Sequence, residues 1–213
     1  MFQKDTYLSS NVDVLKQDIN RIAQYAMYAY CIFALFSLAF SVCRQAGLSF
    51  RTSPILIPIS PILVTIKQLV LQLAPIALWG IFRYTLPAGV KLLRRCSELM
   101  VLYYVLSFIL GQCFNLHLVT MMQNGQITQM ASILTWTEST MGLISVIASL
   151  VAGCHLCSKH RGNMRKLGIA LVLVFMVWLI CSNIISMITT TSAYIYAYYM
   201  MYRAIKTIGC IGQ

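Results

Sequence analysis

Long apolar stretches separated by short polar intervals make up most of this chain. A helix that crosses a bilayer needs about 20 mostly apolar residues. The stretches that meet this length lie at 22–43, 62–82, 99–121, 136–154 and 167–187. The pattern therefore predicts an all-α fold, a polytopic bundle of transmembrane helices that forms a single membrane domain over residues 1–213.

The two ends of the chain are less apolar than the predicted spans. Within residues 1–21, Val12, Leu15 and Ile19 recur at three- and four-residue spacing, which is typical of an amphipathic helix. We expect this segment to be a cytoplasmic lead-in to the first span. Residues 188–213 include a Tyr-rich stretch that is short for a span, so they are predicted to form a tail or a short sixth helix.

The positions of Lys and Arg between the spans predict the orientation, because short basic loops stay in the cytoplasm. Two intervals are strongly basic, and their cations are Arg83, Lys91, Arg94, Arg95, Lys159, Arg161, Arg165 and Lys166. The interval between the third and fourth spans has no Lys or Arg and is expected outside. The N-terminus is then cytoplasmic, and Arg203 and Lys206 favour six crossings over five.

Composition supports a membrane environment. The chain is 59% hydrophobic and 10% charged, whereas about 25% of the residues of a soluble domain are charged. It carries 16 Lys and Arg against 5 Asp and Glu, placed between apolar stretches. They form no stripe that could follow a phosphate backbone, so direct binding of nucleic acid is not expected. The predicted location is a membrane, and the inner membrane if the host is bacterial.

Polar residues inside the predicted spans are candidates for a path across the bilayer, because burying them in lipid is costly. The candidates are Lys67, Gln68, Gln72, Gln112, Asn115, His117, Glu138 and Asn183. A transporter or channel with a polar path around Lys67 and His117 is therefore one alternative. The other reading is that Lys67 extends to the headgroups while the glutamines bond neighbouring helices.

Small residues recur at helical spacing in the last two predicted spans. They are Gly142, Ser145, Ser149 and Gly153 in one span, and Ser182 and Ser186 in the next. Such faces allow close packing of helices in a bilayer. They predict tight helix contacts and assembly into a homo-oligomer.

Cys154 and Cys157 form a C-x-x-C motif, and His160 follows it. Thiolates and imidazoles are zinc ligands, but this set lacks a second ligand pair, so no metal site is predicted. The motif at a helix end also resembles the layout of quinone-linked membrane thiol oxidoreductases such as the disulfide-bond B and vitamin K epoxide reductase families. That resemblance implies redox chemistry at Cys154 and Cys157, although Lys159 and Arg161 place them on the reducing cytoplasmic side.

No dense catalytic motif is present in the sequence, so neither enzymatic activity nor a cofactor is expected. We predict a non-enzymatic membrane scaffold or sensor that oligomerises in the lipid bilayer. Its basic loops would anchor a cytosolic protein partner, for example in a defence, exclusion or signalling complex. The alternative for these cations is contact with anionic lipid. The transporter and the thiol oxidoreductase are the alternatives.

Overall fold

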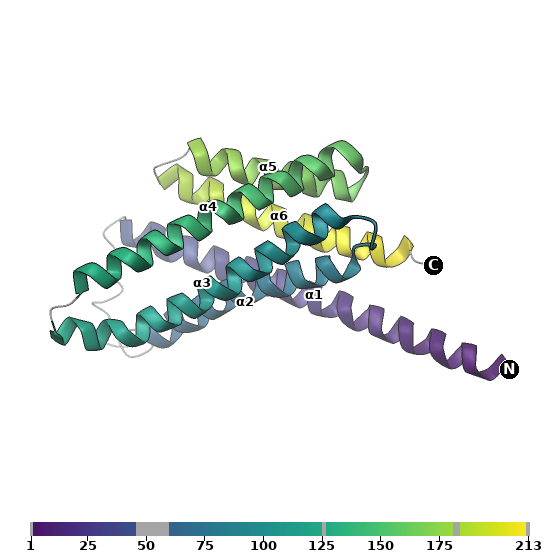
Figure 1. The fold of residues 1–213 in the computed structure, drawn as a ribbon, viewed down its shortest axis with the longest axis horizontal. Helices are drawn as coiled ribbons and strands as arrows, with labels where there is room; N and C mark the ends of the chain where they lie inside the picture. Colours follow the sequence, from purple (N-terminus) through teal and green to yellow (C-terminus); the bar gives the residue numbers. More distant parts are fainter. Residues whose placement is uncertain (1, 46–59, 125–126, 181–183, 212–213) are drawn as a thin grey trace.

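The computed structural model describes residues 2–45, 60–124, 127–180 and 184–211, all of them helical or in short turns (Figure 1). Side chains are described for residue 14 and for 16–43, 65–111, 136–137, 139–177 and 188–208. The helices of the described chain are α1 (Phe2–Gln45), α2 (Ser60–Thr85), α3 (Lys91–Asn124), α4 (Ile127–Lys159), α5 (Asn163–Ile180) and α6 (Ile184–Ile211). The all-α prediction is confirmed for these residues.

The helix bounds differ from the predicted spans where hydropathy is a poor guide. The lead-in and the first span form one helix of 44 residues, about 66 Å long at 1.5 Å per residue. The predicted fifth span, 167–187, runs from α5 into α6, because α5 ends at Ile180 and α6 begins at Ile184. Nearly uniform hydropathy conceals that boundary. α6 has 28 residues, so it is longer than the short helix expected over 188–213.

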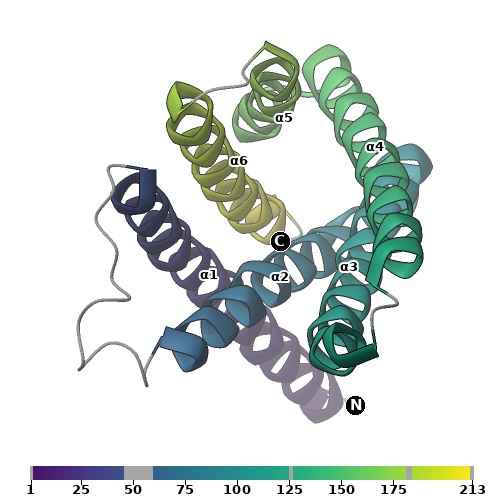
Figure 2. The ribbon, with the colours of Figure 1, turned by 90° about the vertical axis from the view of Figure 1, so that its left-hand side faces the viewer.

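The helices form a closed ring in chain order. Each packs against the next, α6 returns to α1, and α2 also contacts α6. Figure 2 shows this ring from one end, with α4 and α5 on the side opposite α1. Neighbours along the chain therefore alternate in direction, and both chain ends and the α2–α3 and α4–α5 turns lie at the right-hand end in Figure 1.

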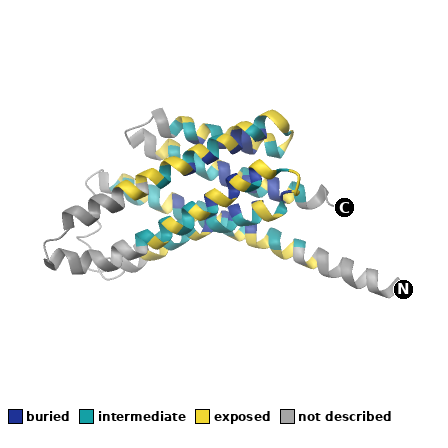
Figure 3. Ribbon diagram, in the orientation of Figure 1, coloured by how far each residue is buried: buried dark blue, intermediate teal, exposed yellow. Residues whose placement is uncertain are grey.

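Buried residues gather in the part of the bundle nearest those turns (Figure 3). Leu78 and Phe82 on α2, Leu93 on α3, Leu156 on α4 and Leu167 on α5 are completely buried there. Each of them lies within two turns of a helix end. The same core includes Ala23 and Met27 of α1 and Met201 and Ile205 of α6, so all six helices contribute to it.

α4 and α5 approach each other through two glycines. A Cβ atom on Gly168 would lie 2.7 Å from the carbonyl oxygen of Gly153 and 2.8 Å from the backbone nitrogen of Cys157. No side chain fits at such distances. The connection between the helices is tight as well, because Gly162 adopts a left-handed conformation at φ 64°, which glycine enters without steric cost.

Three helical segments in the described part of the chain are long and apolar enough to cross a bilayer. They are Lys16–Cys43 in α1, Thr65–Thr85 in α2 and Ser139–Lys159 in α4. Large apolar side chains are also exposed on other helices, for example Leu102 and Ile109 on α3 and Leu173 on α5. The outside of the bundle is therefore apolar on several sides.

Candidate functional site

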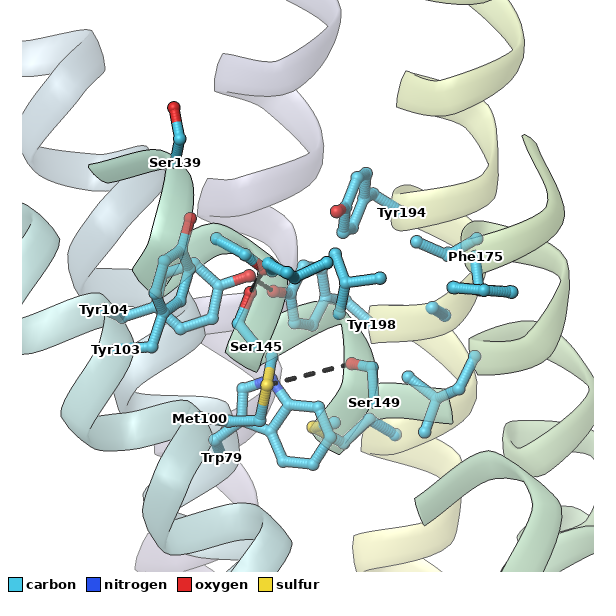
Figure 4. Close-up of a pocket in the computed structure, with 17 residues that line it drawn as sticks. Trp79, Met100, Tyr103, Tyr104, Ser139, Ser145, Ser149, Phe175, Tyr194 and Tyr198 are labelled. Atoms are coloured by element: carbon cyan, nitrogen blue, oxygen red, sulfur yellow. Dashed lines mark hydrogen bonds between the residues drawn. The ribbon is translucent and has the colours of Figure 1, made fainter. Parts of the chain in front are cut away.

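A cavity of about 440 Å³ lies inside the ring of helices (Figure 4). Its wall is built by α3, α4, α5 and α6, with one residue from α2. The lining residues are Trp79, Met100, Tyr103, Tyr104, Ser139, Gly142, Leu143, Ser145, Val146, Ser149, Leu171, Val174, Phe175, Tyr194, Ala197, Tyr198 and Met201. Ser139 and Leu143 are exposed, so the wall reaches the surface along α4.

Tyrosines supply most of the hydroxyl groups in this wall. The hydroxyls of Tyr104 on α3 and Tyr198 on α6 lie 2.7 Å apart and form a hydrogen bond between the two helices. Tyr30 on α1 packs against Tyr198, and the centres of their rings are 4.4 Å apart in an edge-on arrangement. Tyr194 lies one turn before Tyr198, and Figure 4 shows its hydroxyl directed toward the space enclosed by the labelled side chains.

The inner end of the cavity is apolar and contains a buried indole. Trp79 is 1% exposed, and its Nε1 has no hydrogen-bond partner among the described residues. The ring of Trp79 packs edge-on against Phe82 at 6.0 Å. Met100 also lines the cavity, and its sulfur accepts a weak hydrogen bond from Ser149 at 3.8 Å (Figure 4). A buried N–H without a partner is costly, which makes this indole unusual.

None of the lining residues carries a charge at neutral pH. The wall therefore combines aromatic surface, aliphatic surface and hydroxyl groups. Such a site has no group that could neutralise an ion, but it offers several donors to an uncharged molecule. This combination is common in binding sites for small lipophilic ligands.

The polar residues predicted from the second span lie away from the cavity. The Nζ atom of Lys67 is 5.9 Å from the ring centre of Phe40 on α1, a distance at which a cation is attracted to an aromatic face. Gln68 and Gln72 extend toward Gly111 on α3. The Oε1 atom of Gln72 is buried and has no partner in the described part of the chain. These residues do not line a common path with the tyrosines.

Several predicted residues lie outside the side chains that the structure describes. From the polar path these are Gln112, Asn115, His117, Glu138 and Asn183. From the packing faces they are Ser182 and Ser186. The polar path around Lys67 and His117 therefore stays a prediction.

The small residues of α4 take two different positions. Gly142, Ser145 and Ser149 line the cavity, and a Cβ atom on Gly142 would meet nothing within 4 Å. Gly153 instead contacts Gly168 of α5, which is not among the predicted packing residues. A search for glycines facing each other across the α4–α5 turn would have found this pair.

The cysteine motif lies at the end of α4. Cys154 is exposed, and the sulfur of Cys157 is 4.0 Å from the carbonyl oxygen of Arg165. The rings of His155 and His160 are 6.1 Å apart. Among the described residues, no three His, Cys, Asp or Glu side chains are close enough to hold a metal ion. Cys96 is buried, and burial raises the pKa of its thiol, so the reactive thiolate is disfavoured there.

The predicted basic loops meet at one end of the bundle. We call this surface the basic end and define it by Arg83, Lys91, Arg94, Arg95, Lys159, Arg161, Arg165, Lys166, Arg203 and Lys206. Except for the half-buried Arg94, all of these residues are exposed. One carboxylate is paired with this group in the described chain, since Glu98 lies 2.7 Å from Arg83. A hydrogen bond of 2.8 Å from Asn163 to Thr207 joins the α4–α5 turn to α6.

The tyrosines and Trp79 were not predicted from the sequence, in which the Tyr-rich stretch near residue 198 indicates only a short span. The signal that could have identified them is the presence of many tyrosines within apolar helices, because each buried hydroxyl needs a hydrogen-bond partner.

Comparisons with models of protein families, with curated protein sequences and with solved structures give no match to this chain.

Proposed function

We propose that this protein is a multi-pass membrane protein whose basic end docks an acidic cytosolic protein. In this proposal α1 to α6 each cross the bilayer, the protein catalyses no reaction, and copies of it associate through their apolar outer faces. The observation that carries the proposal is the gathering of ten cations at one end, with Glu98 as their paired carboxylate in the described chain.

The apolar outside of the bundle supports six crossings. Besides the three apolar segments of α1, α2 and α4, α3 and α5 expose Leu106 and Met176. Large exposed apolar patches are rare on soluble monomers. A surrounding bilayer covers all of these side chains at once.

The basic end gives the orientation of the proposed topology. Lys and Arg resist transfer across the membrane, so the α2–α3 turn, the α4–α5 turn and the chain ends face the cytoplasm. With six helices, Arg203 and Lys206 lie on the same side as the other cations. A five-helix arrangement would separate them.

The first half of α1 favours a protein over anionic lipid as the partner. We call residues 2–21 the arm. The arm extends past the other helices at the basic end (Figure 1). It carries Lys4, Lys16 and Arg21 against Asp5, Asp13 and Asp18, so its formal charge is zero. Anionic headgroups do not attract a neutral segment strongly, which leaves the arm available beside the basic end.

Affinity purification of the tagged full-length protein from its native host tests this proposal. We expect a stoichiometric acidic cytosolic protein that dissociates when salt is raised from about 0.1 M to about 1 M, because the Debye length falls from about 10 Å to about 3 Å. The double variant Arg94→Gln/Arg95→Gln should lose at least about tenfold in partner affinity. Lys67→Gln, which removes a cation distant from the basic end, is the matched control.

Protease protection of tags at both chain ends checks that the double variant keeps its topology. The proposal is wrong if the protein purifies as a homo-oligomer without a cytosolic partner. It is also wrong if Arg94→Gln/Arg95→Gln reduces only the binding to anionic vesicles and leaves protein binding unchanged.

A further inference from the structure

We infer that the cavity between α3, α4, α5 and α6 binds an uncharged lipophilic ring compound that carries a carbonyl oxygen. This site is independent of the basic end and of any docked protein. Its volume of about 440 Å³ lies within the range of about 300–1,000 Å³ that is usual for small-molecule sites.

The wall determines the charge and shape of the ligand. Since no Lys, Arg, Asp, Glu or His lines the cavity, an ion would lose its hydration shell without gaining a counter-charge. Phe175, Tyr103 and Tyr194 present rings to the enclosed space (Figure 4). Aromatic side chains pack well against a flat ring system.

The hydroxyls determine the polar group of the ligand. The Tyr104–Tyr198 pair holds two O–H protons, and the bond between the two oxygens uses one of them. The other proton has no acceptor among the described residues. The hydroxyl of Tyr194 makes no hydrogen bond within the described part of the chain either, and it is directed into the cavity. A carbonyl oxygen has two lone pairs and accepts from both sources.

The indole of Trp79 supplies a second, deeper donor. Its Nε1 is buried without a partner, and both Trp79 and Met100 line the cavity. Methionine is unbranched and adopts many conformations. The wall beside the indole can therefore adjust so that its N–H donates to a second acceptor on the ligand.

The probe for this site is 2-acetylnaphthalene, with 2-ethylnaphthalene as the analogue that lacks the carbonyl. The chain has 3 tryptophans, so the variant Trp136→Phe/Trp178→Phe retains Trp79 as the sole reporter in nanodiscs. We expect saturable quenching of Trp79 fluorescence. The ketone should bind about three- to tenfold more tightly than the hydrocarbon, which is the effect of one or two net hydrogen bonds.

Two variants locate the binding. Tyr194→Phe removes a hydroxyl that has no described partner, so the protein stays folded while the preference for the ketone falls toward one. Gly142→Leu adds a side chain where a Cβ meets nothing within 4 Å, fills the cavity and abolishes saturable quenching. Tyr196→Phe on the exposed side of α6 is the matched control and should bind as the parent does.

Three results would overturn the inference. One is quenching that rises in proportion to probe concentration without saturation, since this reports partition into lipid. Another is equal affinity for the two naphthalenes, which would indicate an apolar void filled by acyl chains. The third is unchanged quenching in Gly142→Leu, provided that thermal unfolding shows this variant to be folded.

Discussion

Near the α2–α3 and α4–α5 turns the helices contact each other closely, whereas further along the same helices they separate around a cavity. At the turns, Phe82, Leu93, Leu156 and Leu167 are fully buried. In the cavity, the hydroxyl of Tyr194 is directed into open space. The difference indicates that the helices are closely packed at the basic end. The side chains around the cavity have more room to move and can adjust to a bound ligand.

The largest expected effect on stability is at the close contact between Gly153 of α4 and Gly168 of α5. Gly168→Ala places a Cβ atom 2.7 Å from the Gly153 oxygen, and backbone atoms cannot move as a flexible side chain does. We expect the free energy of unfolding to fall by about 3 kcal/mol, at the upper end of the usual cost of overpacking. Unfolding in mixed detergent micelles measures this change. A loss below about 1 kcal/mol would show that the contact is loose.

The tyrosine pair is the next strongest link, and it lies in the looser half. Tyr198→Phe removes the hydroxyl that contacts Tyr104 at 2.7 Å. A typical net hydrogen bond contributes about 1 kcal/mol, so we expect a loss of that size in the same unfolding measurement. Tyr196→Phe serves as the control on the same helix. Equal stability of the two variants would mean that the pair holds the helices together no more than an exposed tyrosine does.

Gly142 lines the cavity, whereas Gly168 lies in the close contact between α4 and α5. The Cβ position of Gly142 is open, and alanine is favoured over glycine in a helix by about 1 kcal/mol. Gly142→Ala is therefore expected to raise the free energy of unfolding by about 0.5–1 kcal/mol. A destabilised variant would contradict the placement of this residue beside a cavity.

The ion pair between Arg83 and Glu98 should have the smallest effect. Both side chains are nearly half exposed, so solvent screens their attraction, and exposed pairs contribute at most about 1 kcal/mol. A double-mutant cycle with Arg83→Gln and Glu98→Gln should give a coupling energy of about 0.5 kcal/mol or less. A larger coupling energy would show that ion pairing, as well as packing, stabilises the basic end.

Hydropathy and charge predicted the helices better than the site. The apolar stretch 62–82 lies within α2, and the basic intervals coincide with the α2–α3 and α4–α5 turns. α3 begins at Lys91, before the predicted 99, because Leu93 and Cys96 face the core from a segment too polar for a hydropathy window. That window detects lipid-facing surface and is insensitive to amphipathic helix ends.

The cavity could not be predicted because it depends on distances between helices. Tyr104 and Tyr198 are 94 positions apart in sequence, and only the return of α6 to the ring brings them together. Similarly, Gly142 and Gly153 belong to one small-residue pattern, yet one borders a cavity and the other contacts a helix. Spacing along a helix shows which residues share a face. Which helix or cavity that face contacts depends on the arrangement of all the helices.

The contact between Gly153 and Gly168 has a consequence for biosynthesis of the protein. α4 and α5 follow each other after a turn of residues 160–162, so they can pair soon after both have left the ribosome. On the proposed topology the turn between them, with Lys159, Arg161 and Arg165, stays in the cytoplasm, and the two helices pair side by side within the bilayer. Since α6 lines the cavity and packs against α1 and α5, the cavity forms only after α6 has been synthesised.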